Sequence, residues 1–273
     1  MTVKIRNRAS KTGAPRKCHQ NGALNGREDM QLDIIRKFPL MLLFCTALTW
    51  AAQDTSGTNV GGCRQIAGQL PHAASTFGHG LALAPRNAIR PANLAWELPI
   101  AAATGLLIAS GDARVNNHIH SPSFTQDASR GSNVGLGIEL GAAGMAYLAG
   151  CSDHRSAYAA NTGFTALEAM GAASLVSLGI KEATNRQYAY ATNTHGEFWE
   201  GGGSFPSGHA TASFAFASVI AHRYPNKPWL KWGVYGLATG ISFARVAGKQ
   251  HFVSDILVGG TVGYVTGTYM ATH

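Results

Sequence analysis

The sequence predicts an all-α fold, a compact bundle of about six helices preceded by a disordered N-terminal arm. Apolar stretches of helical length recur from Leu94 onwards, and none shows the apolar-polar alternation of a strand. The hydrophobic fraction of the 273 residues is 45% and the charged fraction is 13%, which favours a folded chain with a sizeable core. A single folded domain, residues 94–272, accounts for these features.

Residues 1–52 have the composition of an N-terminal extension with a signal peptide. Residues 1–37 carry nine Lys or Arg against three Asp or Glu, whereas the rest of the chain is nearly neutral. This basic stretch is followed by the apolar run 38–50 and then by Ala51 and Ala52. We therefore expect export to a periplasmic or membrane-associated location, with translation starting at Met30. An uncleaved membrane anchor is the alternative. The basic charge lies outside the predicted fold, which argues against a nucleic-acid partner.

Residues 53–93 are rich in Gly, Ala, Ser, Asn and Pro, so we expect a loose arm. Six helices follow, predicted over residues 94–110, 133–150, 158–186, 207–224, 229–245 and 251–272. Two prolines, Pro225 and Pro228, separate the fourth helix from the fifth, and Gly248 follows the fifth. Two glycine series predict close packing of the last two helices: Gly233, Gly236 and Gly240, then Gly259, Gly263 and Gly267.

Two properties of the bundle stay open at this point. Glu139 and Glu168 interrupt apolar runs and are costly in a bilayer, whereas residues 256–272 carry no charge, so both a soluble and a membrane-associated bundle fit. Removal of the leader leaves Cys63 and Cys151, which either pair in an oxidising compartment or remain free thiols.

The first cluster of polar residues lies where a glycine-rich loop meets an apolar helix, at Pro206-Ser207-Gly208-His209. Backbone N–H groups and the helix dipole favour an anion at such a position. Ser207 adds a hydroxyl, Gly208 lets phosphate oxygens approach, and His209 lies beside the anion. An isolated tetrapeptide of this kind is more often only a capped helix start, so the neighbouring motifs decide.

The second cluster contains Arg245, His251 and Asp255. Asp255 follows His251 by one helical turn, so its carboxylate can accept a hydrogen bond from one imidazole nitrogen and leave the other basic. Arg245 supplies a guanidinium suited to phosphate. Upstream, Lys181 and Arg186 end the third predicted helix and can converge on the same anion, although cations at a helix C-terminus are also ordinary partners of its dipole.

Taken in order, these clusters resemble the signature of the type-2 phosphatidic-acid phosphatase and vanadium haloperoxidase superfamily, K-x6-R-P, P-S-G-H and S-R-x5-H-x3-D. The second part matches in full, and the third matches with Ala244 in place of the Ser. The first part departs from the pattern, because Tyr188 and Ala189 stand where the family has Arg and Pro. Arg186 is then the candidate substitute for the missing cation.

The resemblance implies a helical, metal-independent phosphatase for phosphate monoesters. His251 would attack phosphorus to give a phosphohistidine, Asp255 would orient it, and His209 would act first as general acid and then as general base. The residues expected to hold the phosphate oxygens are Lys181, Arg186, Ser207, Gly208 and Arg245. No metal and no other cofactor is expected, and the substrate is a phosphorylated lipid or a soluble phosphorylated small molecule.

Three other functions fit the same residues. A vanadate-dependent haloperoxidase would bind vanadate at His251 in the same cationic pocket. A non-catalytic bundle that binds phosphate or lipid would explain the altered first motif. A zinc hydrolase would use His209, His251 and Asp255 as ligands, although the neighbouring cations would repel the metal.

Overall fold

The computed structural model describes Ser75, Gly78, residues 91–152 and residues 157–273. The predicted signal peptide, the start at Met30, most of the arm and Cys63 lie outside these residues and stay predictions. The elements are α4 (Pro91–Leu106), a π-helical turn (Leu107–Gly111), α5 (Asp112–His118), α6 (Pro122–Ser152), α7 (Ala157–Thr184), a 3-10 turn (Ala189–Ala191), α8 (Gly208–Arg223), α9 (Pro228–Ala247) and α10 (Val253–Thr272). No strand occurs in the described ranges, and the predicted all-α fold is confirmed.

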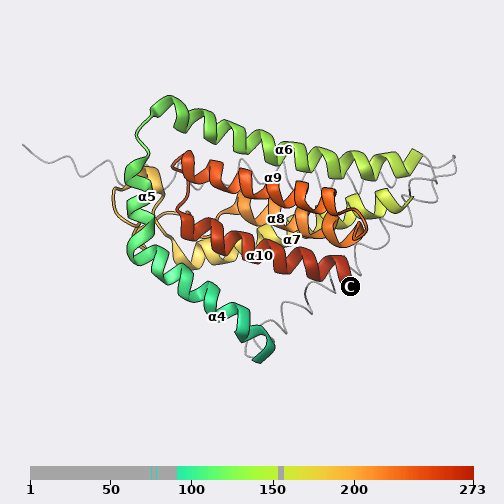
Figure 1. Ribbon diagram of the computed structural model, residues 1–273, viewed down its shortest axis with the longest axis horizontal. Helices are drawn as coiled ribbons and strands as arrows, with labels where there is room; N and C mark the ends of the chain where they lie inside the picture. The colour runs from blue at the N-terminus through green and yellow to red at the C-terminus, as the bar shows by residue number, and fades with distance from the viewer. Residues whose placement is uncertain (1–74, 76–77, 79–90, 153–156) are drawn as a thin grey trace, which may run out of the picture. The chain divides into compact units, whose positions relative to one another are not determined.

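Helix α8 is the centre of the bundle and packs against α7, α9 and α10, while α6 lies along α7 and α9 (Figure 1). Successive helices from α6 to α10 reverse direction, as in an up-and-down bundle. Helices α7 and α9 therefore end where α8 and α10 begin. The short helix α5 lies at this same end (Figure 1). All three predicted motifs fall there.

Helix α6 is longer than predicted, and helix α5 was not predicted. Helix α6 begins at Pro122 instead of Asn133, because Pro is favourable at the first helical position and the Ser121 carbonyl accepts the Thr125 N–H at 3.0 Å. Its first turns are mostly polar, with Phe124 as the one large apolar side chain, so they carry no apolar periodicity. Helix α5, which continues α4 past a π-helical turn, was not predicted because the charged Asp112 ends the apolar run.

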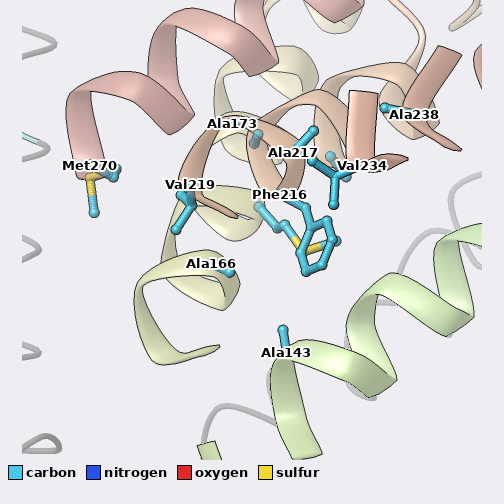
Figure 2. Close-up of a cluster of buried hydrophobic side chains, with 13 residues drawn as sticks. Ala143, Ala166, Ala173, Phe216, Ala217, Val219, Val234, Ala238 and Met270 are labelled. Carbon is cyan, nitrogen blue, oxygen red and sulfur yellow. The ribbon is translucent and has the colours of Figure 1, made fainter. Parts of the chain in front are cut away.

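The core is built mainly from alanines. Five helices contribute to it, and the labelled side chains in Figure 2 are Ala143, Ala166, Ala173, Phe216, Ala217, Val219, Val234, Ala238 and Met270. Small side chains at the contacts allow the helix axes to approach closely. A core of this kind fixes the positions of the helix ends tightly, which matters for the residues gathered there.

Of the two glycine series, only the one in α10 provides close packing. A Cβ on Gly263 would lie 2.1 Å from the Thr211 carbonyl oxygen, and one on Gly259 would lie 2.6 Å from the Ser207 carbonyl oxygen, both on the α8 side. By contrast, no described atom lies within 4 Å of a Cβ on Gly233, Gly236 or Gly240. The prediction for the α9 series was therefore wrong, because those glycines lie on its exposed face.

Helix α7 ends before Arg186, not at it. Asn185 adopts a left-handed conformation with φ 42°, a residue type and geometry that commonly end a helix. Its N–H donates to the Lys181 carbonyl at 2.8 Å. The chain then turns, so Arg186 does not continue the helical face that carries Lys181.

Much of the outer surface is apolar. Two stretches, Ala95–His118 and Ala157–Ala191, are long and apolar enough to cross a membrane, and half of the apolar 18-residue window within the second is buried in the bundle. Large apolar side chains are also exposed on other helices, among them Val134, Ile138, Met145, Leu148, Trp229 and Trp232. Exposed apolar side chains in such number favour an interaction with lipid or with another protein.

Candidate active site

His251 lies in the loop between α9 and α10 and is almost completely buried. Its Nδ1 lies 2.8 Å from the Ser204 carbonyl oxygen and 3.4 Å from Asp255 Oδ2. Since a carbonyl oxygen only accepts hydrogen bonds, Nδ1 carries the proton. The other nitrogen, Nε2, is then the basic one in the neutral ring. The Ser204 contact was not predicted, because no motif points to that residue.

Asp255 occupies the first turn of α10 and reaches back toward His251, which precedes the helix by two residues. Its Oδ2 accepts the Phe252 N–H at 2.9 Å and a short hydrogen bond from the Ser204 hydroxyl. Burial alone would raise the pKa of Asp255, but the hydrogen bond with His251 and the charge of Arg186 outweigh it and hold this pKa below its usual value. Asp255 is therefore ionised at neutral pH.

Arg186 is fully buried and makes ion pairs with two carboxylates. Its Nη1 lies 2.5 Å from Asp255 Oδ1, and its Nη2 lies 2.8 Å from Asp112 Oδ2. The remaining N–H groups donate to Ser254 Oγ and to the carbonyl oxygens of His195 and Gly196. Because a guanidinium has five N–H donors, none is left for a phosphate. The expected phosphate contact of Arg186 is thus not supported, since the turn at Asn185 directs the side chain toward Asp255.

Lys181 and Arg245 lie close enough to His251 for their charges to lower its pKa, and Ser207 and Gly208 form the start of α8. The Lys181 ammonium donates a short hydrogen bond to the Gly203 carbonyl, and its Cε lies 4.0 Å from the position of a Cβ on Gly208. Arg245 Nη1 lies 3.3 Å from Ser132 Oγ and 3.3 Å from Asn133 Oδ1.

Two buried groups, Ser207 Oγ and Arg245 Nε, have no hydrogen-bond partner within the described part of the chain. Unsatisfied donors beside two cations suit an anionic ligand.

His209, on the first turn of α8, hydrogen-bonds through Nε2 to Asn133 Oδ1 at 2.8 Å. Burial lowers the pKa of His209 to about 3, with further lowering by the charges of Arg245, His251 and Lys181. The ring is thus neutral at pH 7 in this state. The negative charge of a bound phosphate would raise the pKa again. Asn133, which holds both His209 and Arg245, was not predicted, because it comes from a polar stretch of α6.

Tyr188 occupies the position at which the family pattern has Arg. Its ring centroid lies 6.2 Å from that of His251, and it stacks on Tyr190 at 5.3 Å. The hydroxyl oxygen lies 3.1 Å from the position of a Cβ on Gly203. A neutral phenol therefore stands beside the histidine in place of a guanidinium.

The metal-site hypothesis finds no geometric support. Over residues 91–152 and 157–273, no group of three or more His, Cys, Asp or Glu side chains is arranged to hold a metal ion. His209, His251 and Asp255 are likewise not arranged as metal ligands. The Asp255 carboxylate instead accepts from donors of four residues.

Comparisons with known proteins agree with the motifs. The family model described as the PAP2 superfamily matches residues 162–272. A lipid A 1-phosphatase of Porphyromonas gingivalis is 34% identical over 65 residues, which cover 23% of this chain and 15% of that protein. The chain therefore aligns with a small part of that relative's length.

Among solved structures, one titled as the first transmembrane PAP2 type phosphatidylglycerolphosphate phosphatase from Bacillus subtilis matches with 20% identity and a TM-score of 0.41. That match covers 72% of this chain and 93% of the other. The resemblance of this chain to the type-2 phosphatidic-acid phosphatase and vanadium haloperoxidase superfamily is confirmed by the family match, with residues 162–272 as the part that carries it.

Proposed function

We propose that this protein hydrolyses phosphate monoesters through a phosphohistidine formed on His251 Nε2, without a metal ion. The observation that carries the proposal is the state of the His251 ring. Its Nδ1 is held by the Ser204 carbonyl and Asp255, which leaves Nε2 as the basic nitrogen next to two cations. A histidine with only a packing role would not need this arrangement.

In the first half of the reaction, His251 Nε2 attacks phosphorus and the bond to the leaving alkoxide breaks. His209, protonated once the phosphate is bound, gives its proton to that alkoxide. Lys181 and Arg245 offset the charge on the phosphoryl oxygens, and the Ser207 hydroxyl donates to one of them. Asp255 stabilises the positive charge that the phosphorylated imidazole acquires.

In the second half, neutral His209 takes a proton from water as the water oxygen attacks phosphorus. The bond from phosphorus to Nε2 breaks and returns the electron pair to His251, and inorganic phosphate leaves. The neutral form of His209 in the ligand-free state suits this step. Positioning of the reactants and electrostatic stabilisation of the transition state supply most of the rate acceleration, so no further reactive group is required.

We infer that the substrate is a phosphorylated lipid and that the bundle associates with a membrane. The curated relative found by comparison is named for a phosphatase of lipid A. The apolar 18-residue window within Ala95–His118 is only 6% buried, and Trp229 and Trp232 are exposed at the start of α9. Exposed tryptophans are typical of the boundary between lipid and water.

The experiment that tests the chemistry is hydrolysis of an aryl phosphate by the full chain in detergent, with excess chelator. We expect turnover by the wild type, none by His251→Ala, and an acid-labile phosphoenzyme when the wild type is quenched during turnover. His222→Ala is the control histidine, because His222 lies in the last turn of α8, at the end opposite His209, and hydrogen-bonds to the Ser218 carbonyl.

The same assay separates the alternatives. Loss of activity in chelator that only zinc reverses would establish the metal hydrolase instead. Bromide oxidation by peroxide with added vanadate, in the absence of phosphatase turnover, would establish the haloperoxidase. Binding of inorganic phosphate without any turnover would leave a binding protein. For the substrate class, we expect a higher kcat/KM for a phosphorylated lipid in mixed micelles than for soluble monoesters, and co-flotation of the protein with liposomes.

A further inference from the structure

A group of buried charges lies behind the reaction centre, on the side of Asp255 away from His251. Asp112, Arg186, Ser254 and Asp255 are each 1% exposed or less. Charges at such depth persist only where they compensate one another and where their hydrogen bonds are satisfied. The network therefore has a defined composition, with two carboxylates and one guanidinium.

Asp112 connects three elements that are distant in sequence. Its Oδ2 accepts hydrogen bonds from Arg186 Nη2 and the Ser254 hydroxyl, and its Oδ1 accepts the Ser254 N–H at 3.0 Å. Ser254 lies in the first turn of α10, so Asp112 also satisfies an N–H group at the start of the helix that carries Asp255. Helix α5 is in this way fixed to the nucleophile's helix.

The Arg186 guanidinium is shielded from water by aromatic rings as well. Its central carbon lies 4.3 Å from the ring centroid of Phe252 and 5.0 Å from that of Phe198. At a buried site, charges interact more strongly than at a surface. If Arg186 faced Asp255 alone, it would neutralise the carboxylate that must stabilise a positive His251.

We propose that Asp112 and Arg186 are positioning residues for the nucleophile, with Arg186 fixing the Asp255 carboxylate and Asp112 offsetting the Arg186 charge so that Asp255 still acts on His251 as an anion. The inference rests on the proposed phosphatase mechanism. It adds a residue that lies outside the family match at residues 162–272. The charges of Asp112, Arg186 and Asp255 sum to one negative charge. Without Asp112, the charges of Arg186 and Asp255 sum to zero.

The groups that face His251 set the background for the test. They are Asp255 of α10, Lys181 of α7, Arg245 of α9, His209 of α8 and the Tyr188 ring. Burial lowers the pKa of His251 and is the largest influence, whereas the hydrogen bond and charge of Asp255 raise it. Removing the negative charge of Asp112 leaves the Arg186 charge opposed by Asp255 alone, which must lower the His251 pKa further.

The test uses the full chain in detergent and measures two quantities in each variant. One is kcat for an aryl phosphate, and the other is the titration midpoint of the His251 ring nitrogens by NMR, assigned by comparison with His251→Ala. For Asp112→Asn we expect kcat to fall about 10- to 100-fold with little change in KM. Loss of the residues that orient metal-binding side chains has effects of this size, and Asp112 orients a nucleophile in a comparable way. We also expect the His251 midpoint to move to lower pH.

Two further variants separate charge from packing. Asn116→Ala is the matched control, because Asn116 is also buried on α5, where it donates to the Ala189 and Thr192 carbonyls without carrying a charge. It should lower the unfolding temperature and leave the His251 midpoint in place. The double variant Asp112→Asn with Arg186→Gln removes one charge of each sign, so its midpoint should return to the wild-type value.

The inference is overturned if Asp112→Asn leaves both quantities unchanged, or if Asn116→Ala moves the midpoint as far as Asp112→Asn does. If Asp112→Asn does not fold, the double variant decides, and a midpoint displaced from the wild-type value refutes the charge argument. A wild type without phosphatase turnover would refute the proposed function instead. The titration would still report whether Asp112 acts on His251.

Discussion

Substitution of Gly263 by alanine is expected to separate α8 from α10 and to impair both stability and catalysis. The added Cβ would lie 2.1 Å from the Thr211 carbonyl oxygen and 3.0 Å from the Ala215 nitrogen. Both are backbone atoms within α8, so no side-chain rotation relieves the contact. The two helices must move apart by about 1 Å to restore an ordinary van der Waals distance.

The magnitude follows from what that movement disrupts. Overpacking at a tight backbone contact costs about 2–4 kcal/mol, which corresponds to a fall in unfolding temperature of roughly 5–15 °C for a domain of this size. The same displacement separates Ser207 and His209 at the start of α8 from Asp255 on α10. Since a misplacement of about 1 Å can reduce turnover by roughly 100-fold, kcat should fall by one to two orders of magnitude.

The assay is thermal unfolding by circular dichroism together with aryl phosphate turnover, both in the same detergent. Gly236→Ala is the matched control, because the added Cβ meets no described atom within 4 Å and alanine favours the helix by about 0.5–1 kcal/mol. The control should therefore be as stable as the wild type or slightly more so. If Gly263→Ala unfolded at the same temperature as Gly236→Ala, the close approach of α8 and α10 would be refuted.

Two further predictions concern single side chains. Tyr188→Arg should tighten inhibition by inorganic phosphate or vanadate, because it places a cation beside His251 where a neutral phenol now stands. An unchanged inhibition constant would show that the new side chain does not reach the anion. Burial raises the pKa of Glu139 to about 7, only partly opposed by the Ser213 hydrogen bond. Its stabilising contribution is then complete below the unfolded-state pKa of about 4.5 and is lost as pH rises through 7. Glu139→Gln should consequently gain stability over the wild type between pH 6 and 8, and parallel denaturation curves across that range would contradict this reasoning.

The sequence predicts the helices well where one face is apolar. The boundaries of α8, α9 and α10 fall within about two residues of those predicted from periodicity and from Pro and Gly punctuation. The polar start of α6 and the short α5 carry no such signal. Both are held by contacts made elsewhere, such as the hydrogen bonds from Asn116 to carbonyls in the loop after α7. Local pattern cannot show contacts of this kind.

The site was likewise predictable only in part. Spacing alone brings Asp255 to His251, although the geometry differs in detail, because the histidine precedes the helix and the carboxylate reaches back from its first turn. Spacing does not reveal the direction of Arg186. A single left-handed residue, Asn185, turns this side chain from the expected anion face toward a carboxylate 69 residues further along the chain.

The position of Arg186 changes the charge that the site offers to a substrate. Because Asp112 and Asp255 both pair with it, Arg186 adds no positive charge at the reaction centre. Lys181 and Arg245 remain as the two cations beside His251, and a phosphate monoester carries about two negative charges at neutral pH. With Tyr188 in place of the motif arginine, the two positive charges of the site therefore equal the two negative charges of a phosphate monoester. A second anionic group on a substrate would need a cation outside this set, so selectivity for such a substrate would depend on residues beyond the three motifs.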